Sequence, residues 1–326
     1  MDDTTWEKLD WTALDRLRAM FLDGTSGGQD YWRSRSDLET YDATFAQRIG
    51  WKWQFVLREL TRRGWSPPEG DVIEWGCGSG IAARTYLRQF GKAATRLVLH
   101  DRSMLAVNFA QERARQEFPE LPVETRHGQD ADAAVVLLSH VLSELSAGQL
   151  EEVLSRCAAA TTIVWVEPGT HADSHKLIAI RERLRGQFQI VAPCTHQAVC
   201  GMLAGGCERH WCHHFATPPV DIHTDGNWRK FGQLAGIDLR ALPLSFLVLD
   251  KRPAPPLPPN ALRLIGRARV YKAYAMAFVC DETGVRDQRV MKRHCPEEYH
   301  HMKRGDSETL QAWRIEGMDA VETLPI

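Results

Sequence analysis

Val72-Ile-Glu-Trp-Gly-Cys-Gly-Ser-Gly80 is the stretch that decides the fold. A short apolar strand runs into a turn with glycines at positions 76, 78 and 80, and a helical pattern follows from Ile81. Glycines let the backbone come close to a ligand, and the first turn of the helix offers free N–H groups. The stretch therefore predicts a ligand-binding loop between a strand and a helix.

An acidic residue, Glu74, stands two positions before the first glycine. The resulting E-x-G-x-G-x-G pattern resembles motif I of class I S-adenosylmethionine (SAM) methyltransferases, in which an acid lies near the methionine part of SAM. A phosphate-binding loop would disfavour that charge. The resemblance implies that Glu74, Gly76, Gly78 and Gly80 bind SAM, and a nucleotide-binding fold of another kind stays the alternative.

Two more carboxylates follow strands of the same series. Asp101 ends the next strand, where a carboxylate can accept hydrogen bonds from both ribose hydroxyls, although an NAD enzyme would carry such an acid as well. Asp130 follows the third strand, where this fold commonly contacts adenine, and a solvated loop aspartate is the alternative. We expect both to bind the cofactor.

Strand-like and helical patterns alternate beyond the glycine loop. Such a βαβ series predicts a parallel, doubly wound α/β sheet, which we place at residues 67–250. The expected strands are 72–75, 96–100, 123–126, 134–138 and 162–166, and the expected helices are 81–90, 103–117 and 147–160. A Cys/His-rich insertion at 191–217 and a strand pair near 239–249 complete this domain.

The two ends of the chain differ from this middle part. Residues 1–66 predict an N-terminal helical cap, with helices over 11–21 and 37–63. The proline-rich run 252–259 cannot continue a helix or a central strand and predicts a stiff linker. Residues 251–326 then predict a small β appendage, because 270–280 and 285–292 alternate like a hairpin.

Composition bounds the class of protein. The chain has 326 residues, 44% of them hydrophobic, and a formal net charge of −2, which argues against a uniformly basic nucleic-acid-coating surface. No apolar run reaches the roughly 18 residues of a membrane span. The start, Met1 to Trp6, lacks the character of a targeting peptide. We expect a soluble, cytoplasmic protein without a membrane partner.

The fourth strand ends in Ser139 and His140. Methyltransferases that act on base amines often carry an Asn/Asp-Pro-Pro-aromatic element here, which this chain lacks. Ser139 and His140 are weak candidates for a catalytic role, since a histidine at a strand end is more often structural.

Cysteines cluster in the insertion. Four of them fall within nineteen residues, at Cys194, Cys200, Cys207 and Cys212, interleaved with His196, His210, His213 and His214. In a reducing compartment such clustering indicates a metal site before disulfides. Thiolates and imidazoles suit zinc or an iron–sulfur cluster, and the spacing does not choose between them.

Two stretches of this insertion carry a family resemblance. Val191-Ala-Pro-Cys-Thr-His-Gln-Ala-Val-Cys200 and Trp211-Cys-His-His-Phe215 resemble signatures of the methyltransferase-like proteins of the small ribosomal subunit. That family is known best as mitochondrial small-subunit assembly factors, and this chain would be a bacterial member. Val166-Glu-Pro-Gly-Thr170 and Ser139-His-Val-Leu-Ser-Glu-Leu145 resemble two further family elements.

The resemblance implies a [4Fe–4S] cluster held by four cysteines. Motif for motif, the ligands are Cys194, Cys200 and Cys212, and Cys280 of the C-terminal β segment is the fourth. The chain departs from the family at Thr195, where proline is usual, and at the doubled His213-His214. The alternative is therefore a zinc site formed by four ligands within the insertion, with Cys207 among them.

The C-terminal segment is basic. Between Lys251 and Arg304 there are twelve Lys/Arg and five Asp/Glu, an excess of seven positive charges. Arginine and aromatic side chains on a small β module suit RNA binding, and the resemblance makes small-subunit rRNA the favoured partner. The candidate RNA-binding residues, with Tyr271 and Tyr274 interleaved, are Arg263, Arg267, Arg269, Lys272, Lys292 and Arg293.

Three functions compete. The first is a SAM-dependent methyltransferase, or methyltransferase-like factor, that acts on the rRNA of the small subunit or in its assembly. The second is a non-catalytic assembly or translation factor in which SAM and the metal site are structural, which the missing base-binding element favours. The third, a small-molecule methyltransferase with a zinc site, leaves the basic C-terminal segment unexplained.

Overall fold

The computed structural model describes residues 6–7, 9–22, 30–125 and 133–326. Contacts divide the chain into two compact units. Unit 1 comprises 1–58, 66–167 and 216–242, and unit 2 comprises 59–65, 168–215 and 243–326. The Cys/His-rich insertion thus groups with the C-terminal barrel, whereas the sequence placed it in the middle domain. None of the described helices is long and apolar enough to cross a membrane.

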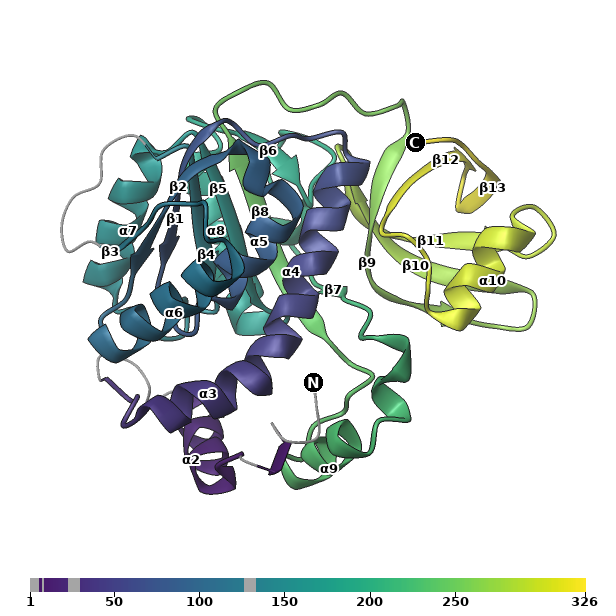
Figure 1. The fold of residues 1–326 in the computed structure, drawn as a ribbon. Helices are drawn as coiled ribbons and strands as arrows, with labels where there is room; N and C mark the ends of the chain where they lie inside the picture. The colour runs from purple at the N-terminus through teal and green to yellow at the C-terminus, as the bar shows by residue number, and fades with distance from the viewer. Residues whose placement is uncertain (1–5, 8, 23–29, 126–132) are drawn as a thin grey trace. The chain divides into compact units, whose positions relative to one another are not determined.

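Unit 1 contains the predicted α/β sheet (Figure 1). Five parallel strands lie in the order β3-β2-β1-β4-β5. They are β1 (Gly70–Trp75), β2 (Ala94–His100), β3 (Val123–Thr125), β4 (Val135–Ser139) and β5 (Thr162–Pro168). Strand β4 is buried along its apolar run, as expected for a central parallel strand. The predicted parallel, doubly wound α/β sheet is confirmed.

Helices connect these strands. They are α5 (Ile81–Phe90), the 3-10 turn η1 (Gly91–Ala93), α6 (Met104–Glu117) and α7 (Ala147–Ala159). Local sequence explains where they begin: Ser103 caps α6, and Ser146 with Gln149 forms a capping box at α7. The helices predicted over 81–90, 103–117 and 147–160 are therefore confirmed to within one residue, whereas the one predicted over 37–63 is divided at Thr44 into two helices.

The remaining helices of unit 1 come from both ends of its sequence. The N-terminal ones are α2 (Trp11–Leu22), α3 (Arg35–Ala43) and α4 (Phe45–Arg62), whose last turn belongs to unit 2. The 3-10 turn η3 (Val220–His223) and α9 (Gly226–Leu234) follow the insertion. Trp6, Trp228 and Phe231 pack together with edge contacts, so the N-terminal helices share an aromatic core with α9.

The part of unit 2 that precedes the barrel contains a helix and three strands, which the sequence only partly predicted. It contains α8 (His171–Leu184), β6 (Gln189–Ala192), η2 (Gly201–Leu203), β7 (His214–Phe215) and β8 (Pro243–Asp250). Strands β6 and β7 both pair antiparallel with β8. One strand, β8, thus takes the place of the expected pair near 239–249.

The C-terminal appendage is a closed barrel. Its elements are β9 (Ala261–Val270), β10 (Tyr274–Asp281), β11 (Gly284–Met291), α10 (Pro296–Arg304), β12 (Leu310–Glu316) and β13 (Asp319–Thr323). The barrel order is β10-β11-β13-β12-β9, with β11 parallel to β13 and α10 between the third and fourth strands. This is the topology of the five-stranded OB-fold. The predicted β10–β11 hairpin is confirmed.

Candidate functional site

The glycine loop joins β1 to α5 at the carboxyl edge of the parallel sheet, where open α/β sheets bind ligands. Gly76, Gly78 and Gly80 all have positive φ. A Cβ on Gly76 would lie 2.7 Å from Val141 Cγ1, so a side chain is excluded there. A Cβ on Gly78 would meet no atom within 4 Å, so the backbone of Gly78 borders open space. The loop thus combines a tight turn with an accessible peptide.

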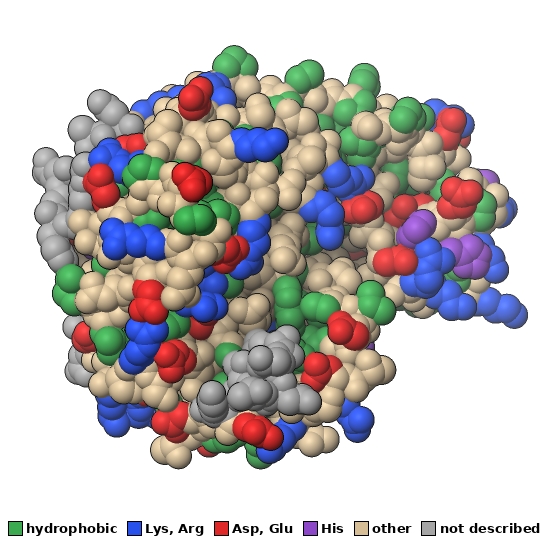
Figure 2. All heavy atoms as spheres, viewed as in Figure 1, with side chains coloured by type: hydrophobic (Ala, Val, Ile, Leu, Met, Phe, Trp, Pro, Cys, Tyr) green, Lys and Arg blue, Asp and Glu red, His purple; other side chains and the backbone are tan. Residues whose placement is uncertain are grey.

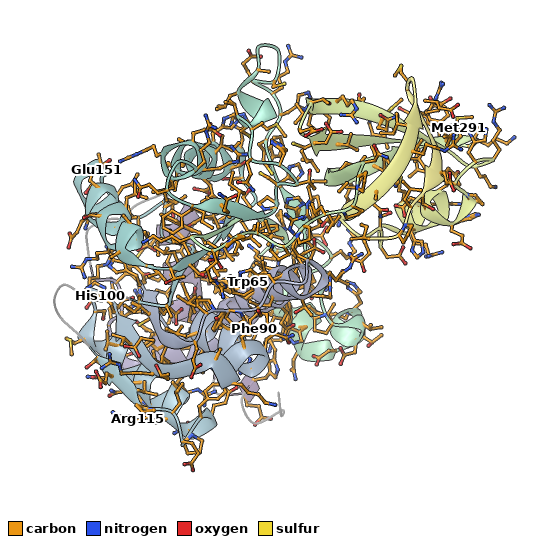
Figure 3. The ribbon with its side chains drawn as sticks, turned by 90° about the horizontal axis from the view of Figure 1, so that it is seen from above. Trp65, Phe90, His100, Arg115, Glu151 and Met291 are labelled. Atoms are coloured by element: carbon orange, nitrogen blue, oxygen red, sulfur yellow. The ribbon has the colours of Figure 1, made fainter. Side chains whose placement is uncertain are left out.

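The end of β2 is fastened to this loop. Asp101 Oδ2 accepts a hydrogen bond from the backbone N–H of Gly78 over 2.8 Å, and Oδ1 accepts one from Ser103 over 3.0 Å. The His100 carbonyl accepts from the N–H groups of Gly76 and Cys77. His100, which is labelled in Figure 3, ends β2. Its ring stacks on that of Trp75. The structure therefore brings Asp101 to the glycine loop. Asp130 lies outside the described residues.

Glu74 lies beneath the loop. Its side chain is buried, and Oε2 accepts a hydrogen bond from the backbone N–H of Ala83 over 3.1 Å. Burial raises the pKa of this carboxyl to about 8, against the lowering influence of the α5 N–H groups and Arg84. Glu74 thus supports the first turn of α5, and a direct contact with SAM stays a prediction.

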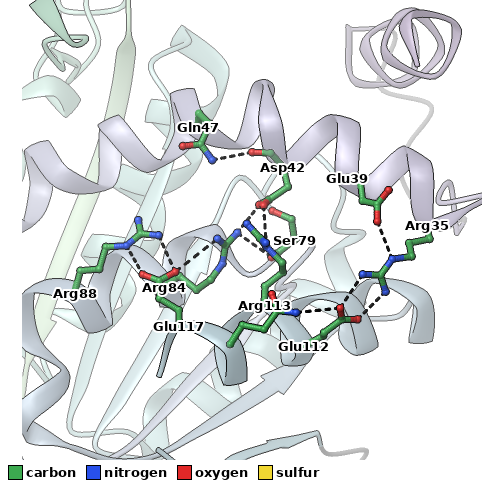
Figure 4. Close-up of polar contacts among 11 residues, drawn as sticks. Arg35, Glu39, Asp42, Gln47, Ser79, Arg84, Arg88, Glu112, Arg113 and Glu117 are labelled. Carbon is green, nitrogen blue, oxygen red and sulfur yellow. Dashed lines mark hydrogen bonds and ion pairs between the residues drawn. The ribbon is translucent and has the colours of Figure 1, made fainter. Parts of the chain in front are cut away.

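Arg84 ties the loop to the N-terminal helices (Figure 4). Its guanidinium is buried, forms an ion pair with Asp42 of α3 and donates to the Ser79 carbonyl over 3.4 Å. Arg113 of α6 reaches the other oxygen of Asp42 over 3.4 Å. Sequence reasoning missed this network, because nothing in the local pattern distinguishes Arg84 from a solvated helix arginine.

Ser139 and His140 stand at the end of β4, on the same edge of the sheet. Ser139 Oγ accepts a hydrogen bond from Trp53 Nε1 over 2.9 Å, and His140 Nε2 lies 3.2 Å from Lys52 Nζ. Enclosure of the imidazole, with the nearby Lys52 charge, lowers the pKa of His140 well below its usual range. His140 also has a φ of 56°, a strained conformation for a residue with a side chain.

Glu167 is a further buried carboxyl that sequence reasoning placed only in a family motif. Its Oε1 accepts hydrogen bonds from the backbone N–H groups of Val141 and Leu142 and from Trp165 Nε1. These bonds hold the chain that follows His140. The one signal in the sequence is an acid at the end of an otherwise apolar strand.

Unit 2 brings together the four cysteines that the resemblance named. Cys200 and Cys280 belong to one buried apolar cluster with Ile178, Met202 and Ile265, and Cys212 packs against it. Burial raises the pKa of the Cys212 thiol, and Cys194, Cys200 and Cys280 raise it further. Burial and Cys194 likewise raise the pKa of Cys200, to about 11. Four thiols from the insertion and from β10 therefore converge.

Polar groups surround the convergent thiols. Arg181 Nε donates to Cys194 Sγ over 3.3 Å, and His196 Nε2 lies 3.6 Å from Cys280 Sγ. The Cys212 carbonyl accepts hydrogen bonds from the hydroxyls of Ser174 and Ser245. Within the described parts of the chain, no group of three or more His, Cys, Asp or Glu side chains is arranged to hold a metal ion.

The other cysteines lie elsewhere. Cys207 is half-buried and is not part of the apolar cluster among the described residues. It is also not among the groups that shift the pKa values of Cys200, Cys212 and Cys280. Cys295 Sγ donates to the Ala320 carbonyl inside the barrel. The placement thus favours Cys280 over Cys207 as the fourth member of the group.

The predicted RNA-binding side chains divide into two groups. Arg267, Arg269, Lys272, Lys292 and Arg293 are exposed on the barrel. Arg263, however, is buried: it forms an ion pair with Glu59 and donates to the Pro193 carbonyl. Arg263 is therefore not available on the barrel surface as the other five candidates are, because the outward side of β9 at this position is covered by other parts of unit 2.

A family model described as "Mitochondrial small ribosomal subunit Rsm22" matches residues 68–307. The chain belongs to the Rsm22 family. This match spans the glycine loop, the four convergent cysteines and most of the barrel, and it confirms the resemblance inferred from the sequence. A search of curated proteins found no match.

The chain is also similar, at low identity, to solved structures of two methyltransferases. The magnesium protoporphyrin IX methyltransferase of Synechocystis PCC 6803 is 12% identical, with 74% of this chain and 100% of that chain covered and a TM-score of 0.39. The precorrin-6y C5,15-methyltransferase of Geobacter metallireducens is 12% identical, with 59% and 85% covered and a TM-score of 0.36.

Proposed function

We propose that this Rsm22-family protein binds SAM at residues 76–80 and acts in the cytoplasm on the small ribosomal subunit, in rRNA methylation or in assembly. Family membership over residues 68–307 supports the small subunit as the partner. The juxtaposition of Gly78 and Asp101 at the carboxyl edge of the sheet supports SAM.

The residues present fit SAM. The open space beside Gly78 admits a ligand to the peptide, and the positive end of α5 lies next to it. Asp101 would hold the ribose hydroxyls, while Gly76, Gly78 and Gly80 would accommodate the methionine part. Glu74 would act indirectly, by holding the first turn of α5 in place.

SAM would supply a sulfonium-activated methyl group, and transfer from it is largely a matter of alignment. Ser139 and His140 border the same edge of the sheet. The lowered pKa keeps the His140 imidazole neutral near pH 7 and makes it a weak base, so His140 would orient a target amine by a hydrogen bond. Glu167 would position His140 through the two N–H groups that follow it.

We also propose that Cys194, Cys200, Cys212 and Cys280 hold a [4Fe–4S] cluster. Four thiolates are the ligand set that such clusters use. Cys200, Cys212 and Cys280 lie in or against one apolar cluster, and Cys194 influences the pKa of all three. Arg181 would offset part of the negative charge of the thiolates. Because Cys280 belongs to β10 and the others to the insertion, the cluster would fasten the barrel to this insertion.

The second candidate is a non-catalytic assembly factor. It is favoured by the end of β4, where Ser139 and His140 are engaged by Trp53 and Lys52 and no base-binding Asn/Asp-Pro-Pro-aromatic element is present.

One experiment separates the two candidates. Small subunits from cells that lack the protein are incubated with the purified full chain and tritiated SAM, and the rRNA is assayed for label. In parallel, crosslinking in cells followed by RNA sequencing reports association. Label that disappears in the His140→Ala variant supports catalysis, whereas association without label favours the assembly factor. Failure of the protein to associate with small-subunit RNA would overturn both.

A further inference from the structure

The outer face of the β10–β11 hairpin is the part of an OB barrel that binds oligonucleotides, together with the loops after its first and fourth strands. Side chains alternate along both strands. Ala275, Ala277, Val279 and Val290 point into the barrel core. The outward residues of β10 are therefore Tyr274, Met276, Phe278 and Cys280, and those of β11 include Val285, Asp287, Arg289 and Met291.

One half of this face is covered by the insertion. His210 stacks on Phe278 with ring centroids 4.5 Å apart, and Val285 and Cys280 pack in the cluster that contains Met202. A Cβ on Gly201 would lie 2.9 Å from Gly284 Cα, so the two backbones touch. The cysteine group thus occupies the half of the face nearest the β10–β11 turn.

The other half of this face carries two stacked rings, Tyr271 and Tyr274, which we call the aromatic shelf. Tyr271 and Tyr274 stack with ring centroids 4.7 Å apart and an interplanar angle of 24°, and Tyr271 is 48% exposed. The shelf is held by its backbone: Tyr271 N–H donates to the Tyr274 carbonyl, and the Tyr299 hydroxyl donates to the Tyr271 carbonyl over 2.7 Å. An exposed, positioned ring of this kind can stack on a nucleobase.

Cations surround the shelf. Lys272 lies between the two tyrosines in the chain, and Lys292 and Arg293 follow β11, whose last residue, Met291, is labelled in Figure 3. Lys292 N–H donates to the Ala273 carbonyl, so the two basic segments adjoin. On the face drawn in Figure 2, Lys, Arg and His side chains gather at the end of the barrel that bears α10.

Two ion pairs complete the surface. Arg269 pairs with Asp287 over 2.6 Å, and Arg289 pairs with Asp319 over 2.5 Å beside the β12–β13 loop. Arg289 also lies over the Tyr274 ring. With Lys272, Lys292 and Arg293 the surface has five cations and two carboxylates, so its net formal charge is +3. Charge and aromatic rings therefore coincide at one end of the barrel.

We propose that this surface binds a short, unpaired segment of RNA, with one base stacked on Tyr271 and the backbone phosphates against Lys272, Lys292 and Arg293. The choice of RNA rests on the proposed function. We expect the bound RNA to be single-stranded, because the faces of bases in a duplex are stacked on neighbouring bases and cannot contact Tyr271. The covered half of the hairpin face limits the site to a few nucleotides.

Fluorescence anisotropy of the full chain with a labelled, unstructured 12-nucleotide RNA tests the proposal, beside a duplex and a DNA of the same sequence. We expect the single-stranded RNA to bind best. Tyr271→Ala should weaken it about 5- to 150-fold, the range of one base–aromatic stack, and Tyr271→Phe should restore it. Quenching of a 2-aminopurine base by the wild-type protein should be lost in Tyr271→Ala and kept in Lys292→Ala.

The matched control is Arg314→Ala, an exposed barrel arginine outside this surface, which should bind as the wild type does. Equal affinity for the duplex, tighter binding of the DNA, or unchanged affinity of Tyr271→Ala would overturn the proposal. These outcomes are distinguishable from failure of the proposed function, which is measured by association with the small subunit and by methyl transfer. If the wild-type protein associates with the small subunit but binds no free single-stranded RNA, only the present inference is refuted.

Discussion

Asp101 Oδ2 accepts the backbone N–H of Gly78 over 2.8 Å, which joins the end of β2 to the middle of the glycine loop. The contact places a carboxylate beside the one glycine of the loop whose Cβ position borders open space. We therefore expect ligand recognition at this edge of the sheet to depend on the charge of Asp101 and on the absence of a side chain at Gly78.

Gly78→Asp should abolish SAM binding. The new carboxylate would fill the open space and stand beside Asp101, and like charges repel strongly where solvent is excluded. Isothermal titration should show at least about a tenfold loss, equivalent to 1.4 kcal/mol. Gly148→Asp, an exposed glycine at the start of α7, should bind SAM as the wild type does. Unaltered SAM affinity in Gly78→Asp would refute the placement of the pocket.

Glu74 should make stability depend on pH. The pKa is about 8 in the folded chain against an ordinary value of 4.5, so between these values the folded state holds a proton that the unfolded state has lost. Stability should therefore fall as pH rises through this window, by up to roughly 1.4 kcal/mol per unit. Glu74→Gln should flatten this dependence in urea unfolding, and exposed Glu120→Gln should not. An unchanged slope in Glu74→Gln would contradict the assignment.

If the cluster is present, anaerobically purified wild-type protein should contain iron and sulfide. Cys280→Ser should lose both, because the variant lacks one of the four proposed thiolate ligands. Cys207→Ser should retain both, since Cys207 stands apart from the convergent group. Iron and sulfide assays with an absorbance scan provide the measurement. Zinc without iron in aerobic and anaerobic preparations alike would contradict the cluster.

Arg263→Ala should destabilise unit 2 by about 3–5 kcal/mol, because the buried Glu59 carboxylate loses its short ion pair with Arg263 and keeps only the longer one to Arg62, over 3.7 Å. Hydrogen exchange of the β9 and β12 amides measures this loss in unit 2. Exposed Arg314→Ala should change stability by less than about 0.5 kcal/mol. If the folded Arg263→Ala protein bound single-stranded RNA more weakly while its barrel amides stayed protected, Arg263 would be an RNA contact after all.

His140→Gly should be more stable than His140→Ala by about 1 kcal/mol, because only glycine adopts a φ of 56° without steric cost. Urea unfolding of the two variants measures the difference. At exposed Ser143, whose φ is not positive, the Ala variant should instead be more stable than the Gly variant. Equal stability of the two His140 variants would show that the backbone relaxes when the imidazole is removed.

The α/β part of the fold follows from local pattern. Strands such as Val135–Ser139 are continuous apolar runs, and helices such as Met104–Glu117 begin at capping residues such as Ser103, so their bounds can be predicted from neighbours in the chain. The barrel could not be predicted in this way. Its closure depends on β11 pairing with β13 and β9 with β12, contacts between segments about thirty and fifty residues apart that leave no local signal.

The site shows the same division. The glycine spacing in residues 76–80 and the cysteine motifs identify candidate binding residues from the sequence alone, because their chemistry depends on the type of side chain. Burial, however, is a property of the packed chain. Only the tertiary structure buries Arg263 against Glu59 and holds Glu74 under α5. It also stacks Tyr271 on Tyr274, at the half of the β10–β11 hairpin face that the insertion leaves uncovered. The sequence by itself determined which groups are present, and packing decided which of them face solvent, because exposure depends on contacts between distant segments.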